Sequence, residues 1–502
     1  MAVGSEQRTI VIVGGGSAGW MTAAALSRFL TRGWSITLIE SEEIGTVGVG
    51  EATIPGIRIF NAALGIDEDE FIRATQGSFK LGIEFEGWLR EGERYIHAFG
   101  QVGRDLGLIA FHHYWLRARG QGANEGLASY SLTASAAAAN RFVRGNPTPN
   151  APLGPMTYAY HFDAGLYAAF LRKQAEARGV VRIEGKISSV RRDGESGDVA
   201  AVSMESGEEV AGDLFVDCSG FRGLLIEDAL ETGYVDWTHW LPCDRALAVP
   251  CASVSPLTPY TRSSARSAGW QWRIPLQHRT GNGHVYCSAY VSDDEAAATL
   301  MSNLDGEALG DPRPIRFQTG MRRKFWNHNV VALGLASGFM EPLESTSIHL
   351  VQSGIERLLK FLPQGPIAAV DRDTYNRQTA FEYERIRDFI IMHYHLNQRT
   401  EPFWQACRTM AIPDSLSAKL DLFRANGRLF READELFTEL GWLQVMVGQG
   451  IVPQGYHPFA DQLTDSELAG FLSSTRKIVD GSIAAMPSHE EFIARHCAAG
   501  VH

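Results

Sequence analysis

Residues 10–19 read IVIVGGGSAG, four apolar residues followed at once by a glycine-rich turn. The apolar run predicts a buried parallel strand. A helix is expected over residues 17–30 and a second apolar strand over residues 34–39, and Glu40 follows that strand directly. Strand, glycine turn, helix, strand and acidic residue make one βαβ unit of the kind that binds a dinucleotide.

Three glycines of this turn have separate tasks in a dinucleotide site. Gly14 allows the tight turn, Gly16 lets the backbone approach a pyrophosphate, and Gly19 lets the helix pack closely on the strand. The helix then begins at Ser17 and Ala18, where free N–H groups and a positive dipole end favour phosphates. These five residues are therefore predicted to hold the cofactor.

Glu40 is placed to accept hydrogen bonds from a ribose of the same cofactor. The sequence shows no second strand–GxGxxG–helix unit that would hold a nicotinamide cofactor. A single dinucleotide site beside a large, aromatic-rich remainder favours FAD over NAD.

The bulk properties exclude several classes of protein. The 502 residues carry a formal net charge of −12, which argues against nucleic acid as a partner. Six scattered cysteines form no CxxC pair, so no metal site is predicted and a reducing compartment is favoured. With no apparent secretory signal and no apolar run of membrane-spanning length, a cytoplasmic enzyme that needs no membrane is expected.

The pattern of apolar residues changes along the chain. Strands and helices alternate over about the first 350 residues, and the remainder is mainly helical. We expect an α/β protein with an FAD-binding, Rossmann-like βαβ domain of the flavin monooxygenase type and a substrate sheet in residues 1–365. A mainly helical region that covers the substrate is expected in residues 366–502. Within this scheme residues 161–178 are predicted as a helix and residues 284–291 as a strand.

Four later segments share one order with a known family. They read GVGEATIP at residues 48–55, SFKLG at 78–82, WQWRIP at 270–275 and GFMEPLESTSI at 338–348. Together they resemble the flavin-dependent halogenases of the tryptophan halogenase type. The WxWxIP string is specific to halogenases among relatives of the flavin monooxygenases, and the resemblance extends to about residue 460.

The resemblance implies a reaction in which reduced FAD, O2 and chloride or bromide give hypohalous acid. A separate NAD(P)H-dependent flavin reductase would supply the FADH2. Lys80 would hold the oxidant by a hydrogen bond, or carry it as a haloamine, beside an electron-rich aromatic ring. Glu344 would polarise the oxidant or stabilise and deprotonate the ring cation. The halide would lie on the backbone N–H groups of Thr346 and Ser347.

Elementary chemistry supports these roles. A helix amino terminus at Thr346 supplies the N–H donors and the positive dipole end that a halide needs. Apolar neighbours such as Phe79 and Leu81 can lower the pKa of Lys80 and so provide some neutral amine. The simpler alternatives are a surface lysine and an acid at a helix start.

The resemblance assigns further residues to the flavin and to the tunnel. Further contacts with the flavin are implied at Gly50, Ala52, Ile187, Leu335 and Ile348. A wall between flavin and substrate is implied for Trp270, Trp272, Ile274 and Pro275. Alternation along a strand places both tryptophan rings on one face, which plain core packing would also explain.

The substrate is predicted less closely than the reaction. His97, Phe99 and Trp442 are expected to contact a small aromatic substrate. However, the carboxyl-terminal third lacks the adjacent tyrosine pair of the tryptophan enzymes, and Ser347 stands where they usually have glycine. We therefore expect indole or an indole derivative rather than free tryptophan.

Two alternatives stay open at this stage. The first is a flavin monooxygenase that hydroxylates an aromatic ring, which would need neither Lys80 nor the tryptophan wall. The second is a flavin-binding protein without catalytic activity. The sequence also leaves open whether the protein forms a homodimer.

Overall fold

The computed structural model describes residues 7–44, 50–147 and 153–500. Gly48 and Val49 of the first motif lie outside the described residues. The chain forms two compact units, and each unit draws on three segments. The first unit contains residues 1–76, 162–239 and 317–383, and the second contains residues 77–161, 240–316 and 384–502. Both units are thus built from segments that alternate along the chain. The single boundary expected near residue 365 stays a prediction.

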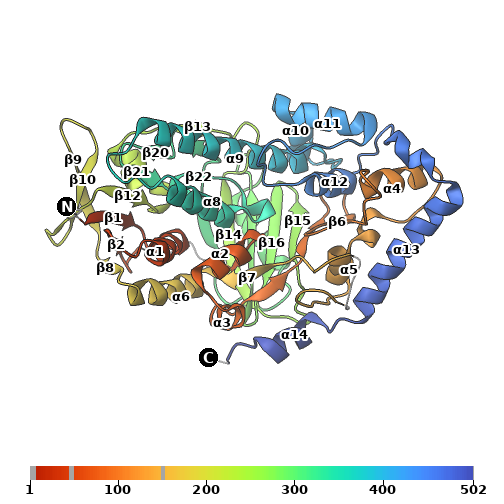
Figure 1. The fold of residues 1–502 in the computed structure, drawn as a ribbon, viewed down its shortest axis with the longest axis horizontal. Helices are drawn as coiled ribbons and strands as arrows, with labels where there is room; N and C mark the ends of the chain where they lie inside the picture. Colours follow the sequence, from red (N-terminus) through yellow and green to blue (C-terminus); the bar gives the residue numbers. More distant parts are fainter. Residues whose placement is uncertain (1–6, 45–49, 148–152, 501–502) are drawn as a thin grey trace, which may run out of the picture. The chain divides into compact units, whose positions relative to one another are not determined.

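A six-stranded sheet forms the centre of the first unit (Figure 1). Strand β1 (Arg8–Val13) pairs in parallel with β2 (Trp34–Glu40) and with β12 (Leu214–Asp217), and α1 (Ser17–Phe29) connects β1 to β2, which confirms the predicted βαβ unit. The sheet order is β20 (Trp326–Asn327), β21 (Val330–Ala332), β12 (Leu214–Asp217), β1 (Arg8–Val13), β2 (Trp34–Glu40) and β8 (Val181–Glu184).

Helices and two small sheets complete the first unit. The helices are α1 (Ser17–Phe29), α2 (Gly56–Leu64), α3 (Glu68–Ala74), α6 (Ala164–Ala177) and α8 (Ser347–Lys360). The small sheets contain β9 (Ile187–Arg192), β10 (Val199–Met204) and β11 (Glu209–Ala211), and β13 (Tyr234–Asp236), β19 (Gly320–Arg322) and β22 (Gly338–Phe339). The short strand β3 spans Gly50–Ala52.

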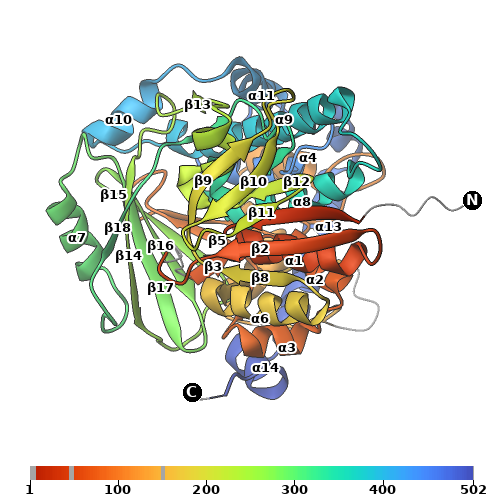
Figure 2. The same cartoon turned by 90° about the vertical axis from the view of Figure 1, so that its left-hand side faces the viewer.

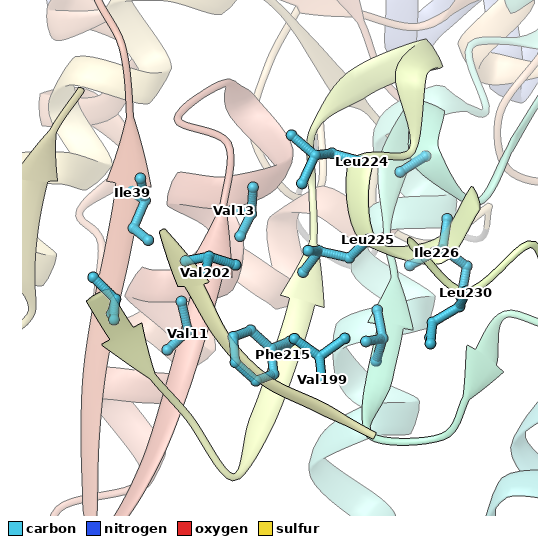
Figure 3. Packing of buried hydrophobic residues seen from close by; sticks show 14 of the residues in the cluster. Val11, Val13, Ile39, Val199, Val202, Phe215, Leu224, Leu225, Ile226 and Leu230 are labelled. Carbon is cyan, nitrogen blue, oxygen red and sulfur yellow. The ribbon is translucent and has the colours of Figure 1, made fainter. Parts of the chain in front are cut away.

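The apolar run of β1 lies in a buried core of this unit (Figure 3). Val11 and Val13 point to the same side of the sheet and pack with Val202 and Phe215. All four side chains are at least 95% buried. Burial of each contributes about 1.5–3 kcal/mol, which explains why the run forms a central strand.

A seven-stranded sheet dominates the second unit (Figure 2). Its neighbours are antiparallel except for the parallel pair β15 and β5. The order is β18 (Arg313–Arg316), β14 (Arg245–Ala252), β17 (Arg279–Tyr286), β16 (Gly269–Pro275), β15 (Thr261–Arg266), β5 (Gly82–Glu86) and β6 (Arg94–Ala98). The short strand β4 (Ser78–Lys80) pairs separately with β7 (Ala159–Asp163).

Helices follow the strands towards the carboxyl terminus, as the sequence predicts. Helix α9 (Ala369–His395) is the longest. The helices of the second unit are α4 (Phe111–Gly120), α5 (Leu132–Ala138), α7 (Asp293–Ser302), α10 (Pro402–Thr409), α11 (Asp414–Asn426), α12 (Glu439–Gly448), α13 (Asp465–Ala484) and α14 (His489–His496). Among the described residues, no helix has the length and apolar character needed to cross a membrane.

Two predicted elements are wrong in their bounds. The helix expected from His161 begins only at Ala164, because Asp163 caps it by accepting hydrogen bonds from the Gly165 and Leu166 amides. His161 instead lies in a strand. The strand expected over residues 284–291 spans Arg279–Tyr286, where its pairing with β14 and β16 ends.

Candidate active site

The glycine turn after β1 has the spacing of a phosphate site. A Cβ atom on Gly14 would lie 2.2 Å from the carbonyl oxygen of Cys218, and Gly14 has φ +112°. A Cβ atom on Gly19 would lie 1.8 Å from the Gly14 oxygen, so α1 packs directly on the turn. A Cβ atom on Gly16, in contrast, would meet nothing within 4 Å. The backbone beside Gly16 is therefore open, as the predicted approach of a pyrophosphate requires.

Helix α1 presents its amino terminus to this space. Ser17 and Ala18 begin the helix, no side chain caps it, and its first turn contains no acidic residue. Helix α8 packs on α1 and on α2 in the same unit, and the three helices lie side by side in Figures 1 and 2. The positive dipole end and the open backbone therefore suit the phosphates of FAD.

Glu40 is already engaged by the protein. Its Oε1 accepts a hydrogen bond from Arg182 at 2.5 Å, and its Oε2 accepts one from the indole of Trp20 at 3.2 Å. A Cβ atom on Gly15 would lie 1.5 Å from Oε2, so that glycine makes room for the carboxylate. A carboxylate has further lone pairs. The contact with a ribose stays a prediction.

The strand β3 contains Glu51, a residue for which the sequence analysis predicted no role. Burial, and secondarily the charge of Asp163, raises the pKa of Glu51 to about 7. Glu51 lies between Gly50 and Ala52, two predicted flavin contacts. Its place within the GVGEATIP motif was the signal for it. A carboxyl group with a pKa near neutrality can exchange a proton at physiological pH.

The predicted halide turn precedes α8. Ser345 has a left-handed backbone with φ +61°, which is uncommon for a residue other than glycine. Thr346 is the N-cap of α8 and Ser347 its first residue, so the turn directs the first amides of the helix outward from its end. Glu344 is 1% exposed and Ile348 is 4% exposed. This arrangement can bind an anion through backbone N–H groups.

Other predicted flavin contacts occupy separate places in the first unit. Leu335 lies in the short 3₁₀ turn Gly334–Ala336, and a Cβ atom on Gly334 would lie 2.9 Å from Ala18. That turn therefore adjoins the start of α1. Ile187 begins β9 and packs against the core of the unit. Core packing is a sufficient reason for an apolar residue there.

A histidine–glutamate pair fixes the first turn of α8. The His349 Nε2 and Glu382 Oε1 atoms lie 2.8 Å apart, and Arg357 donates to Glu382 Oε2 at 3.0 Å. Burial alone would raise the pKa of Glu382, but His349 and Arg357 outweigh it and lower the pKa to about 2. The pair holds α8 against α9.

Glu382→Gln is expected to lower the free energy of unfolding by about 1–3 kcal/mol at pH 7, because it weakens charge-assisted hydrogen bonds. The folded-state pKa lies below the unfolded value of 4.5. The stabilisation is therefore fully present above pH 4.5 and is lost as the pH falls towards 2. Urea unfolding of parent and variant at pH 7 and at about pH 3 measures this. An equal difference at both pH values would contradict it.

Lys80 ends the short strand β4 in the second unit. The residue is 0% exposed, and its Nζ lies 5.3 Å from the centre of the Phe99 ring. Phe79 packs in an aromatic cluster with Phe142 and Phe492. A surface position for Lys80 is thus excluded. The structure places Lys80 and Phe99 together, as the predicted roles require.

The predicted tunnel wall forms one strand. Trp270, Trp272, Ile274 and Pro275 all lie buried in β16. The two tryptophan rings are 6.1 Å apart. Trp272 lies over Gly283, where a Cβ atom would clash at 2.0 Å. The wall is rigid because β16 is paired on both sides, with β15 and with β17.

His97 and Trp442 meet in an aromatic cluster of the second unit. The rings of Phe389 and Phe437 stack at 3.7 Å, the His97 ring lies 5.6 Å from Phe389, and Trp442 meets Phe389 edge-on at 4.8 Å. Lys419 lies 4.4 Å above the Trp442 ring and pairs with the buried Glu435. The Trp442 ring is therefore packed between Phe389 and the Lys419 amine.

A cavity of about 440 Å³ lies in the second unit, and Lys80, His97, Phe99 and Trp442 are not among its described lining residues. Phe99 precedes the first of its lining residues, which include Gly100, Gln101, Leu132, Thr133, Pro155 and Thr157. The described residues that line it carry no charge. Hydroxyl, amide and apolar groups of this kind suit a neutral molecule that forms hydrogen bonds.

Comparison with known proteins agrees with this arrangement. The tryptophan halogenase family model matches residues 9–465. Tryptophan 6-halogenase ThaL of Streptomyces albogriseolus is 35% identical, over 90% of this chain and 91% of its own. Two solved structures are similar as well. The flavin-dependent halogenase Xcc4156 of Xanthomonas campestris shares 52% identity with a TM-score of 0.96, covering 99% of both chains.

A second similar solved structure is that of BrvH, a flavin-dependent halogenase from Brevundimonas sp. BAL3. It is 47% identical with a TM-score of 0.94 and covers 98% of this chain and 99% of its own. Both the sequence match and the fold thus extend over nearly the whole chain. From the glycine turn, the buried lysine and these similarities, we conclude that the chain belongs to the tryptophan halogenase family of flavin-dependent halogenases.

Proposed function

We propose that this enzyme halogenates an indole or a neutral indole derivative through Lys80. The overall reaction joins the aromatic compound, a halide, O2, FADH2 and one proton. It yields the aryl halide, FAD and two molecules of water. When bound, reduced FAD supplies with O2 the two-electron oxidising capacity that converts the halide to hypohalous acid. Chloride and bromide both satisfy this balance.

The protein residues then direct the oxidant. The Lys80 amine donates a hydrogen bond to hypohalous acid, or takes up the halogen as a haloamine with release of water. Glu344 accepts the proton that leaves the ring when the carbon–halogen bond forms. The backbone N–H groups of Thr346 and Ser347 hold the halide beforehand. Gly14, Gly16 and the start of α1 hold the cofactor.

The buried lysine is the observation that carries the proposal. Lys80 is 0% exposed, and a lysine is almost never buried so fully unless the protein holds its amine in a defined place. A hydroxylase of the same fold has no use for an amine there. The face of the Phe99 ring lies 5.3 Å from the Lys80 Nζ and helps to stabilise a cation there.

A neutral substrate is supported by the lack of an adjacent tyrosine pair in the carboxyl-terminal third and by the cavity that begins one residue after Phe99. An amino acid zwitterion needs ionic partners for two charges, and the described lining residues offer only amide, hydroxyl and apolar groups. Leaving such charges unpaired costs several kcal/mol on transfer from water. We infer that neutral indole derivatives are preferred over free tryptophan.

N-acetyltryptophanamide and tryptophan make a matched pair of substrates, because they differ mainly in the two charges. We expect kcat/KM to be at least about 10-fold higher for the amide. Purified protein is supplied with FAD, NADH, a separate flavin reductase and bromide, and products are identified by mass and bromine isotope pattern. A preference for tryptophan would contradict the substrate class and leave the halogenase intact. A product that gains one oxygen and no halogen would overturn the halogenase itself.

The electrons come from a separate flavin reductase in this proposal. The described residues show one glycine turn of the dinucleotide type, at Gly14 to Gly19. Without added reductase, the protein with NADH and FAD should give negligible product. The same assay with and without reductase checks this requirement.

A further inference from the structure

We propose that a hydrogen-bonded chain through Thr261, His161 and Ser78 sets the position of the catalytic amine of Lys80. The inference rests on the proposed role of Lys80. It assigns His161 and Thr261 as positioning residues, since neither touches the reacting atoms in the proposed reaction. The four residues come from three strands of the second unit, β4, β7 and β15.

The direction of each hydrogen bond follows from its end. Ser78 Oγ lies 2.6 Å from the Pro275 carbonyl oxygen, which can only accept, so the serine hydroxyl donates there. The serine oxygen must then accept from His161 Nδ1, 3.1 Å away. His161 Nε2 lies 2.9 Å from Thr261 Oγ1 and accepts from that hydroxyl. One tautomer, with the proton on Nδ1, satisfies the whole chain.

The imidazole of His161 stays neutral in this arrangement. Burial, followed by the charge of Lys80, holds the pKa of His161 well below its ordinary value. His489 and Arg273 act in the same direction. With the ring neutral and its proton on Nδ1, Nε2 is left to accept from the Thr261 hydroxyl. Lys80 therefore has a fixed dipole beside it rather than a second cation.

Strand register connects this chain to the amine. Ser78 lies opposite His161, and Lys80 lies opposite Ala159, across the pair β4 and β7. Ser78 and Lys80 are two residues apart, so their side chains leave the same face of β4. The small Ala159 opposite Lys80 leaves room for the long side chain. A change at His161 therefore shifts the strand that carries the amine.

The chain also reaches the tunnel wall. Pro275, which accepts from Ser78, is the last residue of β16, the strand of Trp270 and Trp272. All side chains of the hydrogen-bonded chain are at least 95% buried. A buried network whose members are all satisfied permits one arrangement of these strands. A displacement of the amine by about 1 Å is enough to reduce turnover by up to about 100-fold.

The test compares Thr261→Val, which removes the donor, with Thr261→Ser, which retains it. His161→Leu and His161→Asn form a second pair, since asparagine retains a donor near Nδ1. The assay contains reductase, NADH, bromide, indole and a soluble β-diketone that traps escaping hypohalous acid. The ratio of brominated indole to brominated trap reports how well Lys80 captures the oxidant. Folding alone does not change this ratio.

Thr261→Val and His161→Leu should lower kcat for indole about 10-fold and shift the product towards the trap, with little change in KM. Thr261→Ser should stay near the parent, and His161→Asn should fall between. His284→Gln is the matched control. His284 is also a buried histidine, in β17, and its hydrogen bond to the Ala296 carbonyl is not part of the Thr261–His161–Ser78 network. This variant should lose stability and keep the parental ratio.

Two outcomes separate this inference from the proposed function. If Lys80→Met halogenates with the parental ratio, the role of Lys80 is wrong and the inference falls with it. If Lys80→Met shifts bromination from indole to the trap while Thr261→Val and His161→Leu keep the parental ratio, only the positioning role is overturned. Should Thr261→Val fail to fold, the pair His161→Asn and His161→Leu decides in the same way.

Discussion

Lys80→Met is expected to reduce halogenation of indole at least about 10³-fold while flavin binding and NADH consumption continue. Methionine keeps an apolar stem in a position that is 0% exposed, so packing is largely retained. What disappears is the amine that captures hypohalous acid. Lys80→Ala should have the same effect on product and a larger cost in stability. Product formation by mass spectrometry, beside NADH consumption, measures the result.

The control for this prediction is Lys477→Ala, at an exposed position in α13. It removes a lysine of ordinary environment and should halogenate at the parental rate. If Lys80→Met brominates indole at more than about a tenth of that rate, the proposed role of the Lys80 amine is wrong. Flavin binding should be equal in all three proteins, since Lys80 belongs to the second unit and the glycine turn to the first.

Gly16→Val is expected to weaken FAD binding by about 5- to 150-fold, which corresponds to about 1–3 kcal/mol of steric conflict. The side chain would enter the space beside the turn, where a Cβ atom meets no protein atom within 4 Å. The fold without cofactor should therefore tolerate it. Flavin titration followed by fluorescence gives the affinity, and thermal melting without FAD gives the stability.

Gly14→Ala is the contrasting variant. Its Cβ atom would lie 2.2 Å from the Cys218 carbonyl, and its φ of +112° strains any other residue. Its melting temperature should fall even without FAD. If Gly16→Val lowers that melting temperature as much as Gly14→Ala, the space beside Gly16 belongs to the core and the assigned phosphate site is wrong.

Local pattern was sufficient for much of the fold and of the cofactor site. The apolar run ending at Gly14, the helix from Ser17 and the helix from Ser347 all follow from side-chain periodicity and end signals that act within a few residues. The four motifs identified the family because they occur along the chain in the same order as in the flavin-dependent halogenases. Composition near residue 365 did not reveal compact units built from three segments each.

Partnerships across the chain required the tertiary structure. Local periodicity placed His161 in a helix, yet it pairs with Ser78 across 83 positions and with Thr261 across 100. The engagement of Glu40 by Arg182 is equally distant, across 142 positions. The residue types and motifs thus determine that a dinucleotide-binding halogenase is encoded. Which buried groups orient Lys80 is decided only by folding, because hydrogen bonds between strands depend on register and packing that no short segment contains.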